Sequence, residues 1–326
     1  MGVMHVPQGI AYAILAKVPP VVGLYVSFFP PLFYMLMGTS HHSSLGSFSM
    51  SSLMCGLAVT RLTEIDNGNG TISSTGIEPI SVATTLAFIV GVMQASEGES
   101  IIMGLLHLDF VTTYFSDQVV SGFTTGASMH VFVSQLKDAF GLRGLTRRTG
   151  TGYLVMTLYD VITHITETNL VAFGIFAASF VFILIGKEVL TPLFKKHIYK
   201  SSVPIPYELF VIIASIVGSW FFNVAENYDV RVVGDLPTGF PPITVPQFDI
   251  IDDLLLDGLA IAIVVVALHL SLSKMFAKKL DYDCDANQEL YAIGVSSVAS
   301  SFFSVCPVSC SLGRILLNVD VGTKTL

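Results

Sequence analysis

The stretch "SVCPVSCSLGRILLNV", residues 304–319, decides the fold class, because it places one arginine, Arg314, in a segment that is otherwise apolar or small. Its part from 309 to 319 has about half of the roughly 20 residues that a helix needs to cross a bilayer. An arginine at the centre of a membrane helix costs about 2.5 to 3.5 kcal/mol on insertion scales, and it marks a transport pathway or a buried pair. The alternative is an arginine that reaches the cytoplasmic interface or pairs with an acid such as Asp320.

The composition is that of an integral membrane protein. Of the 326 residues, 52% are hydrophobic and 12% are charged, against about 25% charged in soluble domains. The net charge of -8 averages loops of very different charge, so it indicates neither an acidic nor a basic partner. No basic run is interleaved with aromatic residues, so nucleic-acid binding is not indicated.

Hydrophobic runs predict an all-α polytopic protein with eight long spans and two short ones. Residues 47–60 and 309–319 are too short to cross alone, and each follows a polar, extended lead. Polar backbone at membrane depth needs protein or water around it, and short segments at matching places in two halves indicate a transporter's binding site. The long spans are residues 2–16, 21–38, 80–106, 118–140, 170–186, 209–225, 254–273 and 289–303.

Lysines in short loops predict the orientation, because cytoplasmic loops are enriched in Lys and Arg. Loops 187–200 and 274–279 carry lysines and are two spans apart, so both are expected in the cytoplasm. The acidic loop 223–253 then lies outside, as does loop 61–79, whose Asn69 begins an N-glycosylation sequon. Arginines in loop 141–152 count against this assignment. We expect a multi-pass protein of the plasma membrane.

The short helices predict an anion site. Arg314 shares a helix face with Ser311, and the start of that helix adds a partial positive charge and free N–H groups. The other short helix begins after Ser47 and Phe48, and in an inverted repeat its start points at the same place. In the first span Pro7 bends or breaks the helix. Gln8 and Tyr12 share one helix face, where Gln8 offers an amide donor and Tyr12 a hydroxyl donor.

Other candidate groups have plainer interpretations. Asp257 opens the eighth span, as a coupling carboxylate or as an interfacial end residue. His269, His130 and Gln135 are expected to bond to neighbouring helices. The four cysteines show no paired metal-ligand spacing, and no nucleophile has a base beside it. We therefore expect no metal, no cofactor and no enzyme activity.

Longer motifs carry a resemblance to a known family. The stretches "HVPQGIAYAILAKVPP" (residues 5–20), "VVSGFTTGASMHVFVSQLK" (119–137), "PIPYELFVII" (204–213) and "NQELYAIGVSSVASSFF" (287–303) are similar to the sulfate permease (SulP) family of anion transporters. The likeness covers nearly the whole chain and fits best the animal branch, which includes pendrin, prestin and sulfate transporters. Residues 95–100 depart from the family pattern as an insert with two glutamates in a span.

The resemblance implies two inverted seven-helix repeats, with a core domain that moves against a gate domain and an anion held between the third and tenth helices. It divides the chain into a first repeat (1–225, helices 1–7, start truncated), an extracellular loop (226–253) and a partial second repeat (254–326, helices 8–10), with the STAS domain absent. Gly313 stands where relatives often have serine, and Ser47 where they commonly have proline. The substrate residues implied by the match are Gln8, Tyr12, Ser47, Phe48, Ser311 and Arg314.

We therefore expect a secondary active anion transporter, most simply of sulfate or of sulfate exchanged for chloride, bicarbonate or oxalate. Its expected partners are that inorganic anion, membrane lipid and, in the full-length form, a second copy of the chain. Two alternatives stay open: an anion channel-like or voltage-sensing protein, and a non-transporting truncated isoform.

Overall fold

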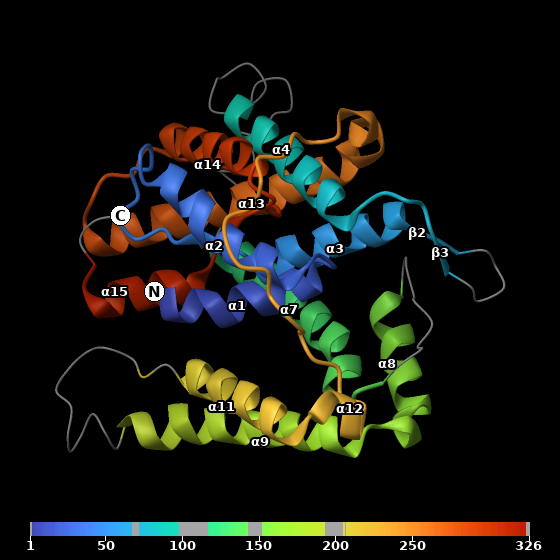
Figure 1. Cartoon of the computed structure of the whole chain (residues 1–326). Helices are drawn as coiled ribbons and strands as arrows, with labels where there is room; N and C mark the ends of the chain where they lie inside the picture. Colours follow the sequence, from blue (N-terminus) through green and yellow to red (C-terminus); the bar gives the residue numbers. More distant parts are fainter. Residues whose placement is uncertain are drawn as a thin grey trace. The chain divides into compact units, whose positions relative to one another are not determined.

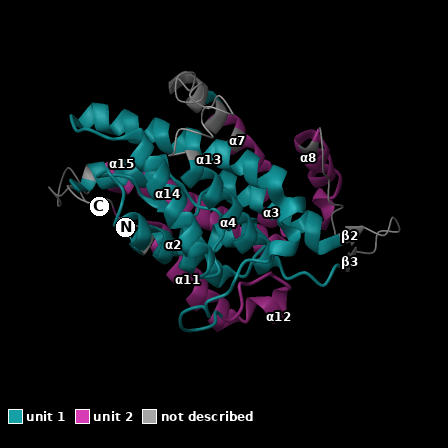
Figure 2. Ribbon diagram, turned by 90° about the horizontal axis from the view of Figure 1, so that it is seen from above, with its two compact units in different colours: residues 1–123, 236–326 teal, residues 124–235 magenta. Residues whose placement is uncertain are grey.

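A computed structural model describes residues 2–66, 72–97, 117–142, 152–192, 205 and 207–323. These residues form two compact units, one of residues 1–123 with 236–326 and one of residues 124–235, coloured separately in Figure 2. Helix α7 (Asp117–Ala139) contributes its first residues to the first unit and the remainder to the second.

The first unit is built from helices and two very short sheets (Figure 1). Its strands are β1 (Leu45–Gly46), β2 (Glu64–Asp66), β3 (Ile72–Ser74) and β4 (Ser309–Cys310). β1 pairs with β4 and β2 pairs with β3, both antiparallel. Its helices, besides the start of α7, are α1 (Gly2–Leu15), α2 (Pro20–Tyr34), α3 (Ser49–Thr63), α4 (Pro79–Glu97), α13 (Ile251–Leu280), α14 (Ala286–Ser301) and α15 (Leu312–Val321), with a 3-10 turn at Phe248–Ile250.

Small residues bring the helices of the first unit into close contact. A side chain at Gly91 of α4 would collide with Val298 of α14, and one at Gly294 of α14 would collide with Ala95 of α4. Small residues at helix contacts let the backbones approach closely, which is how membrane helices associate. Val82, Leu86, Leu254 and Ile293 lie within the apolar core that results.

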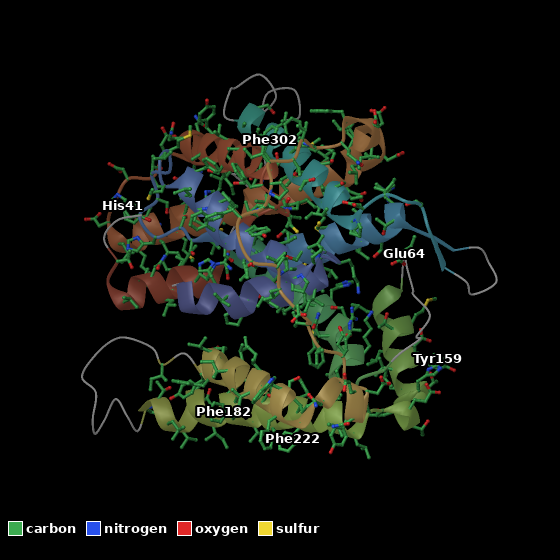
Figure 3. The ribbon with its side chains drawn as sticks, in the orientation of Figure 1. His41, Glu64, Tyr159, Phe182, Phe222 and Phe302 are labelled. Atoms are coloured by element: carbon green, nitrogen blue, oxygen red, sulfur yellow. The ribbon has the colours of Figure 1, made fainter. Side chains whose placement is uncertain are left out.

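The second unit holds the remainder of α7, α8 (Tyr153–Thr163), α9 (Leu170–Ile185), α11 (Tyr207–Phe222) and α12 (Val224–Tyr228), with a 3-10 turn at Ile165–Glu167 and a π-helical turn at Gly186–Leu190. Most apolar side chains of α9 and α11 are exposed within the unit. Phe182 of α9 is 45% exposed and Phe222 of α11 is 58% exposed (Figure 3). Apolar faces of this kind are typical of helices that contact lipid or further helices.

The helices confirm the all-α prediction and the two short helices after extended leads. Three helices are long and apolar enough to cross a membrane, within the described residues: 79–96, 170–190 and 248–280. α1 runs through Pro7 without a break, so of the two expected effects of this proline the structure excludes the break. The helical part of the insert ends at Glu97, and residues 98–100 lie outside the described residues.

α8 and α13 differ from the sequence prediction. α8 was missed, because its 11 residues are too few to cross a bilayer alone and include Asp160. α13 is longer than residues 254–273, since Asp252 and Asp253 favour an earlier start by interacting with the helix dipole. At its other end Asp281 takes a left-handed conformation with φ 56°, which terminates the helix.

Candidate anion-binding site

Paired strands bring the two short helices together. β1 and β4 pair antiparallel, with Leu45 opposite Cys310 and Gly46 opposite Ser309. Each strand leads into a helix within a few residues: α3 follows β1 and α15 follows β4. Residues far apart in the sequence therefore place two helix N-termini at one short sheet.

Neither helix start is capped by its own side chain. Phe48 is the N-cap of α3 and Ser311 is the N-cap of α15, both with extended backbones and no side-chain capping bond. The first N–H groups of a helix have no intrahelical acceptor, so they remain available to a negatively charged group. Phe48 and Ser311 are both partly buried.

Arg314 lies buried between these helix starts, with 1% of its surface exposed. Its Nη1 donates to the backbone oxygen of Ser47 at 2.7 Å and lies 3.5 Å from Gln8 Oε1. Its Nη2 donates to the backbone oxygens of Ser44 at 3.3 Å and Ser309 at 3.2 Å. The guanidinium is thus held in one place by acceptors from α1, the lead of α3 and β4.

The acceptors of Arg314 are all neutral. Within the described residues no carboxylate forms an ion pair with it, and its Nε is buried without a hydrogen-bond partner. The side chain of Asp320, the alternative partner, lies outside the described residues. Burying a charge without a counter-charge costs several kcal/mol. The arrangement therefore suits a bound anion, and the buried arginine side chain does not reach the surface of the protein.

The structure brings some predicted residues together more closely than others. Gln8 and the backbone of Ser47 contact Arg314 directly. Tyr12 lies one turn beyond Gln8, is partly buried and is close enough to Arg314 to interact electrostatically. Phe48 and Ser311 occupy the two N-caps, without a described contact to the guanidinium.

Two residues beside Arg314 escaped the sequence analysis. Ser44 supplies a backbone acceptor to the guanidinium, and His5 Nε2 lies 3.3 Å from Ser44 Oγ. The available signal was spacing, since His5 precedes Gln8 by three residues and Tyr12 by seven and therefore shares their helix face.

A second polar cluster fixes the segment that leads into β1. The Glu289 carboxylate, buried at the start of α14, accepts from Tyr34 Oη at 2.6 Å and from His269 Nε2 at 2.8 Å. It also accepts from the backbone N–H and hydroxyl of Thr39 and the N–H of Ser40. Such a satisfied carboxylate holds α2, α13 and α14 in one arrangement. His269 is therefore bonded to a neighbouring helix, as expected.

The remaining candidates lie elsewhere. Asp257 of α13 pairs with Arg61 of α3, and both side chains are partly exposed, at 37% and 56%. This contact fits an interfacial end residue better than a coupling carboxylate. Asn69 lies outside the described residues.

Comparisons with known proteins match the chain to one protein family along its whole length. The profile of the family described as "Sulfate permease family" matches residues 1–326. The chain is 41% identical to the protein named "Prestin" of Danio rerio, over 99% of this chain and 44% of that one. It is 38% identical to the "Sulfate transporter" of Homo sapiens, over 100% of this chain and 46% of that one. The chain thus spans about half the length of the curated relatives it matches.

A solved structure has a similar fold. The inward-facing murine anion transporter, solute carrier 26 family member A9, matches with a TM-score of 0.85 at 30% identity. That match covers 99% of this chain and 52% of the murine one. The fold is therefore the inverted-repeat transporter fold, with core and gate domains.

Proposed function

The chain belongs to the sulfate permease family, and on that premise we propose that it acts as a secondary active transporter of inorganic anions. Sulfate is the first candidate, alone or in exchange for chloride, bicarbonate or oxalate. The relative named as a sulfate transporter supports this choice at 38% identity. Binding is electrostatic, and no covalent step is involved.

One observation carries the proposal: Arg314 is buried among neutral acceptors at the meeting point of two uncapped helix starts. A guanidinium offers donors in a planar fork that suits an oxyanion. Two helix N-termini add fixed partial positive charge at no cost of reorganisation. An anion in this place supplies the missing counter-charge, and helix-terminus sites of this kind recur in transporters.

We propose that transport is elevator-like, with the site carried by a core domain that moves against a gate domain. The division into a first repeat (1–225), a loop (226–253) and a partial second repeat (254–326) is part of this proposal. So are a homodimer of the full-length form and a plasma-membrane location.

The test is uptake of radiolabelled sulfate by cells that express the longest chain the gene encodes. Saturable uptake above that of untransfected cells is expected, and it should be reduced by each competing anion that shares the site. Stimulation by chloride on the opposite side of the membrane identifies exchange. Absence of saturable uptake of sulfate, chloride, bicarbonate and oxalate alike would overturn the proposal.

The same preparation distinguishes the alternatives. A channel-like or voltage-sensing protein gives anion current or voltage-dependent charge movement without coupled exchange. A non-transporting form gives neither. It is recognised by comparing uptake in cells that express residues 1–326 with uptake in cells that express the longest chain.

A further inference from the structure

His5 faces the same place as Arg314. Its side chain is 9% exposed, and its Nε2 lies 3.3 Å from Ser44 Oγ. A Cβ atom added to Gly46 would meet His5 Cε1 at 3.2 Å, His5 Nδ1 at 3.3 Å and Arg314 Nη2 at 3.5 Å. The imidazole and the guanidinium therefore lie on one side of Gly46, at the end of β1.

Unpaired polar atoms gather at this place. Within the described residues, the buried side-chain nitrogen and oxygen atoms without a partner include His5 Nδ1, Ser309 Oγ and Arg314 Nε. Buried polar atoms are paired in the great majority of cases, so unpaired ones indicate a partner that is supplied from outside. When His5 Nε2 carries the hydrogen and donates to Ser44, Nδ1 has a free lone pair.

Arg314 is a charged side chain beside His5, since its Nη2 and the imidazole both lie within 3.5 Å of a Cβ built on Gly46. Of the two helices that pack on α1, α2 has no Asp, Glu, Lys or Arg, and the one such residue of α3, Arg61, pairs with Asp257. The facing elements also carry other titratable side chains. They are Tyr12 of α1, Tyr25 and Tyr34 of α2, Cys55 of α3, Cys310 of β4, and His41 and His42 before β1, of which His42 Nε2 lies 2.9 Å from Thr323 O.

These charges determine whether proton binding by His5 and anion binding at the site favour or oppose each other. With the site empty, a proton on His5 would put a second positive charge beside the guanidinium, so the neutral imidazole is favoured. A doubly charged anion near both groups reverses that preference, because it attracts the imidazolium. Proton binding and dianion binding then stabilise each other.

We propose that His5 is a proton-accepting residue of the anion site, which takes one proton from solvent onto Nδ1 when a divalent oxyanion binds beside Arg314. The proton and the dianion occupy the site together, and the new Nδ1–H donates to an anion oxygen. A monovalent anion is already balanced by Arg314 and needs no proton. This inference rests on the proposed function and names its substrate class, a divalent oxyanion with a proton.

The first experiment compares pH profiles of uptake in the longest chain the gene encodes, from about pH 8 to about pH 6. With one coupled proton, the KM for sulfate in the wild type increases about tenfold for each unit by which the pH is raised, wherever His5 is neutral in the free protein. His5→Gln should flatten that dependence, while the KM for chloride stays level in both proteins. His42→Gln removes another buried histidine and should keep the wild-type profile.

The second experiment uses purified protein and a pH indicator in weak buffer, so it does not depend on any variant folding. Addition of sodium sulfate to the wild type should take up about one proton per site, and sodium chloride about none. No proton uptake with sulfate, or a His5→Gln profile identical to that of the wild type, would overturn the inference. If the wild type shows no saturable uptake of sulfate, chloride, bicarbonate or oxalate, the proposed function fails instead, so the two failures are distinguishable.

Discussion

The guanidinium of Arg314 donates to the backbone oxygen of Ser47 at 2.7 Å, which ties the first turn of α15 to the lead of α3. This bond joins the two short helices across the β1–β4 pair. It also fixes a charge whose described partners are neutral. A bound anion is the natural complement of such a charge.

The Glu289 cluster should be essential for stability. Glu289→Gln places an amide N–H₂ where several donors converge, so buried groups lose their acceptor. We expect a loss of about 3 to 5 kcal/mol, by analogy with buried pairs that lose one partner. The measurement is the midpoint of thermal unfolding in detergent.

The matched control is Glu208→Gln, which breaks a partly exposed pair with Lys187. Exposed pairs contribute about 0 to 1 kcal/mol, so its midpoint should stay near that of the wild type. Equal midpoints for Glu289→Gln and Glu208→Gln would show that the buried cluster does not stabilise the fold.

The contact between α1 and α2 depends on two glycines. A Cβ at Gly23 would overlap the backbone carbonyl of Gly9, which cannot move without shifting α1. We expect Gly23→Ala to displace the face that carries Gln8 and to reduce both folded yield and sulfate uptake. The control Gly174→Ala adds a Cβ in open space on α9 and should be neutral or slightly stabilising. Wild-type yield and uptake for Gly23→Ala would contradict the packing described.

A substitution at Asp257 tests whether this residue is a coupling carboxylate or one partner of a surface ion pair. Because its pair with Arg61 is partly exposed, Asp257→Asn should change stability by less than about 1 kcal/mol and leave sulfate uptake near that of the wild type. The measurement is initial uptake rate normalised to surface expression. Loss of exchange with normal expression would instead make Asp257 a coupling carboxylate.

Chemical labelling of Cys284 tests both the predicted membrane orientation and the pKa of its thiol. It lies in the turn between α13 and α14, where burial raises the pKa of its thiol to about 11 and the Glu289 charge adds to the rise. The reactive thiolate is therefore scarce at neutral pH and increases about tenfold per pH unit below that pKa. We expect an impermeant maleimide to label it from the cytoplasmic side, faster as pH rises.

Cys284→Ser is the control, because Cys55, Cys306 and Cys310 are buried. It should abolish labelling. Labelling from outside would reverse the predicted orientation, and a rate that does not change with pH would contradict the raised pKa.

The sequence predicted the helices that have strong local signals. Apolar runs located most spans, and polar leads located both short helices. Arg314 stood out because a charge in an apolar segment is rare. α8 was missed because its length and Asp160 resemble a loop more than a span.

The remainder depends on contacts between distant segments. The pairing of Leu45 with Cys310 and the bond between His5 and Ser44 join residues with no local pattern in common. A lone histidine on an apolar helix gives no signal until the partner that approaches it is known. The five bonds to Glu289 likewise arise only when α2, α13 and α14 meet.

The most direct measurement of the central claim is saturable uptake of radiolabelled sulfate by Arg314→Gln, beside Arg61→Gln, both normalised to surface expression. Arg61 is an exposed arginine of the other short helix, so its loss should leave uptake near that of the wild type. Removing one partner of a buried charge pair costs about 2 to 5 kcal/mol, so Arg314→Gln should lower uptake about thirtyfold or more. Wild-type uptake by Arg314→Gln would contradict the claim that this guanidinium is the fixed charge of the anion site.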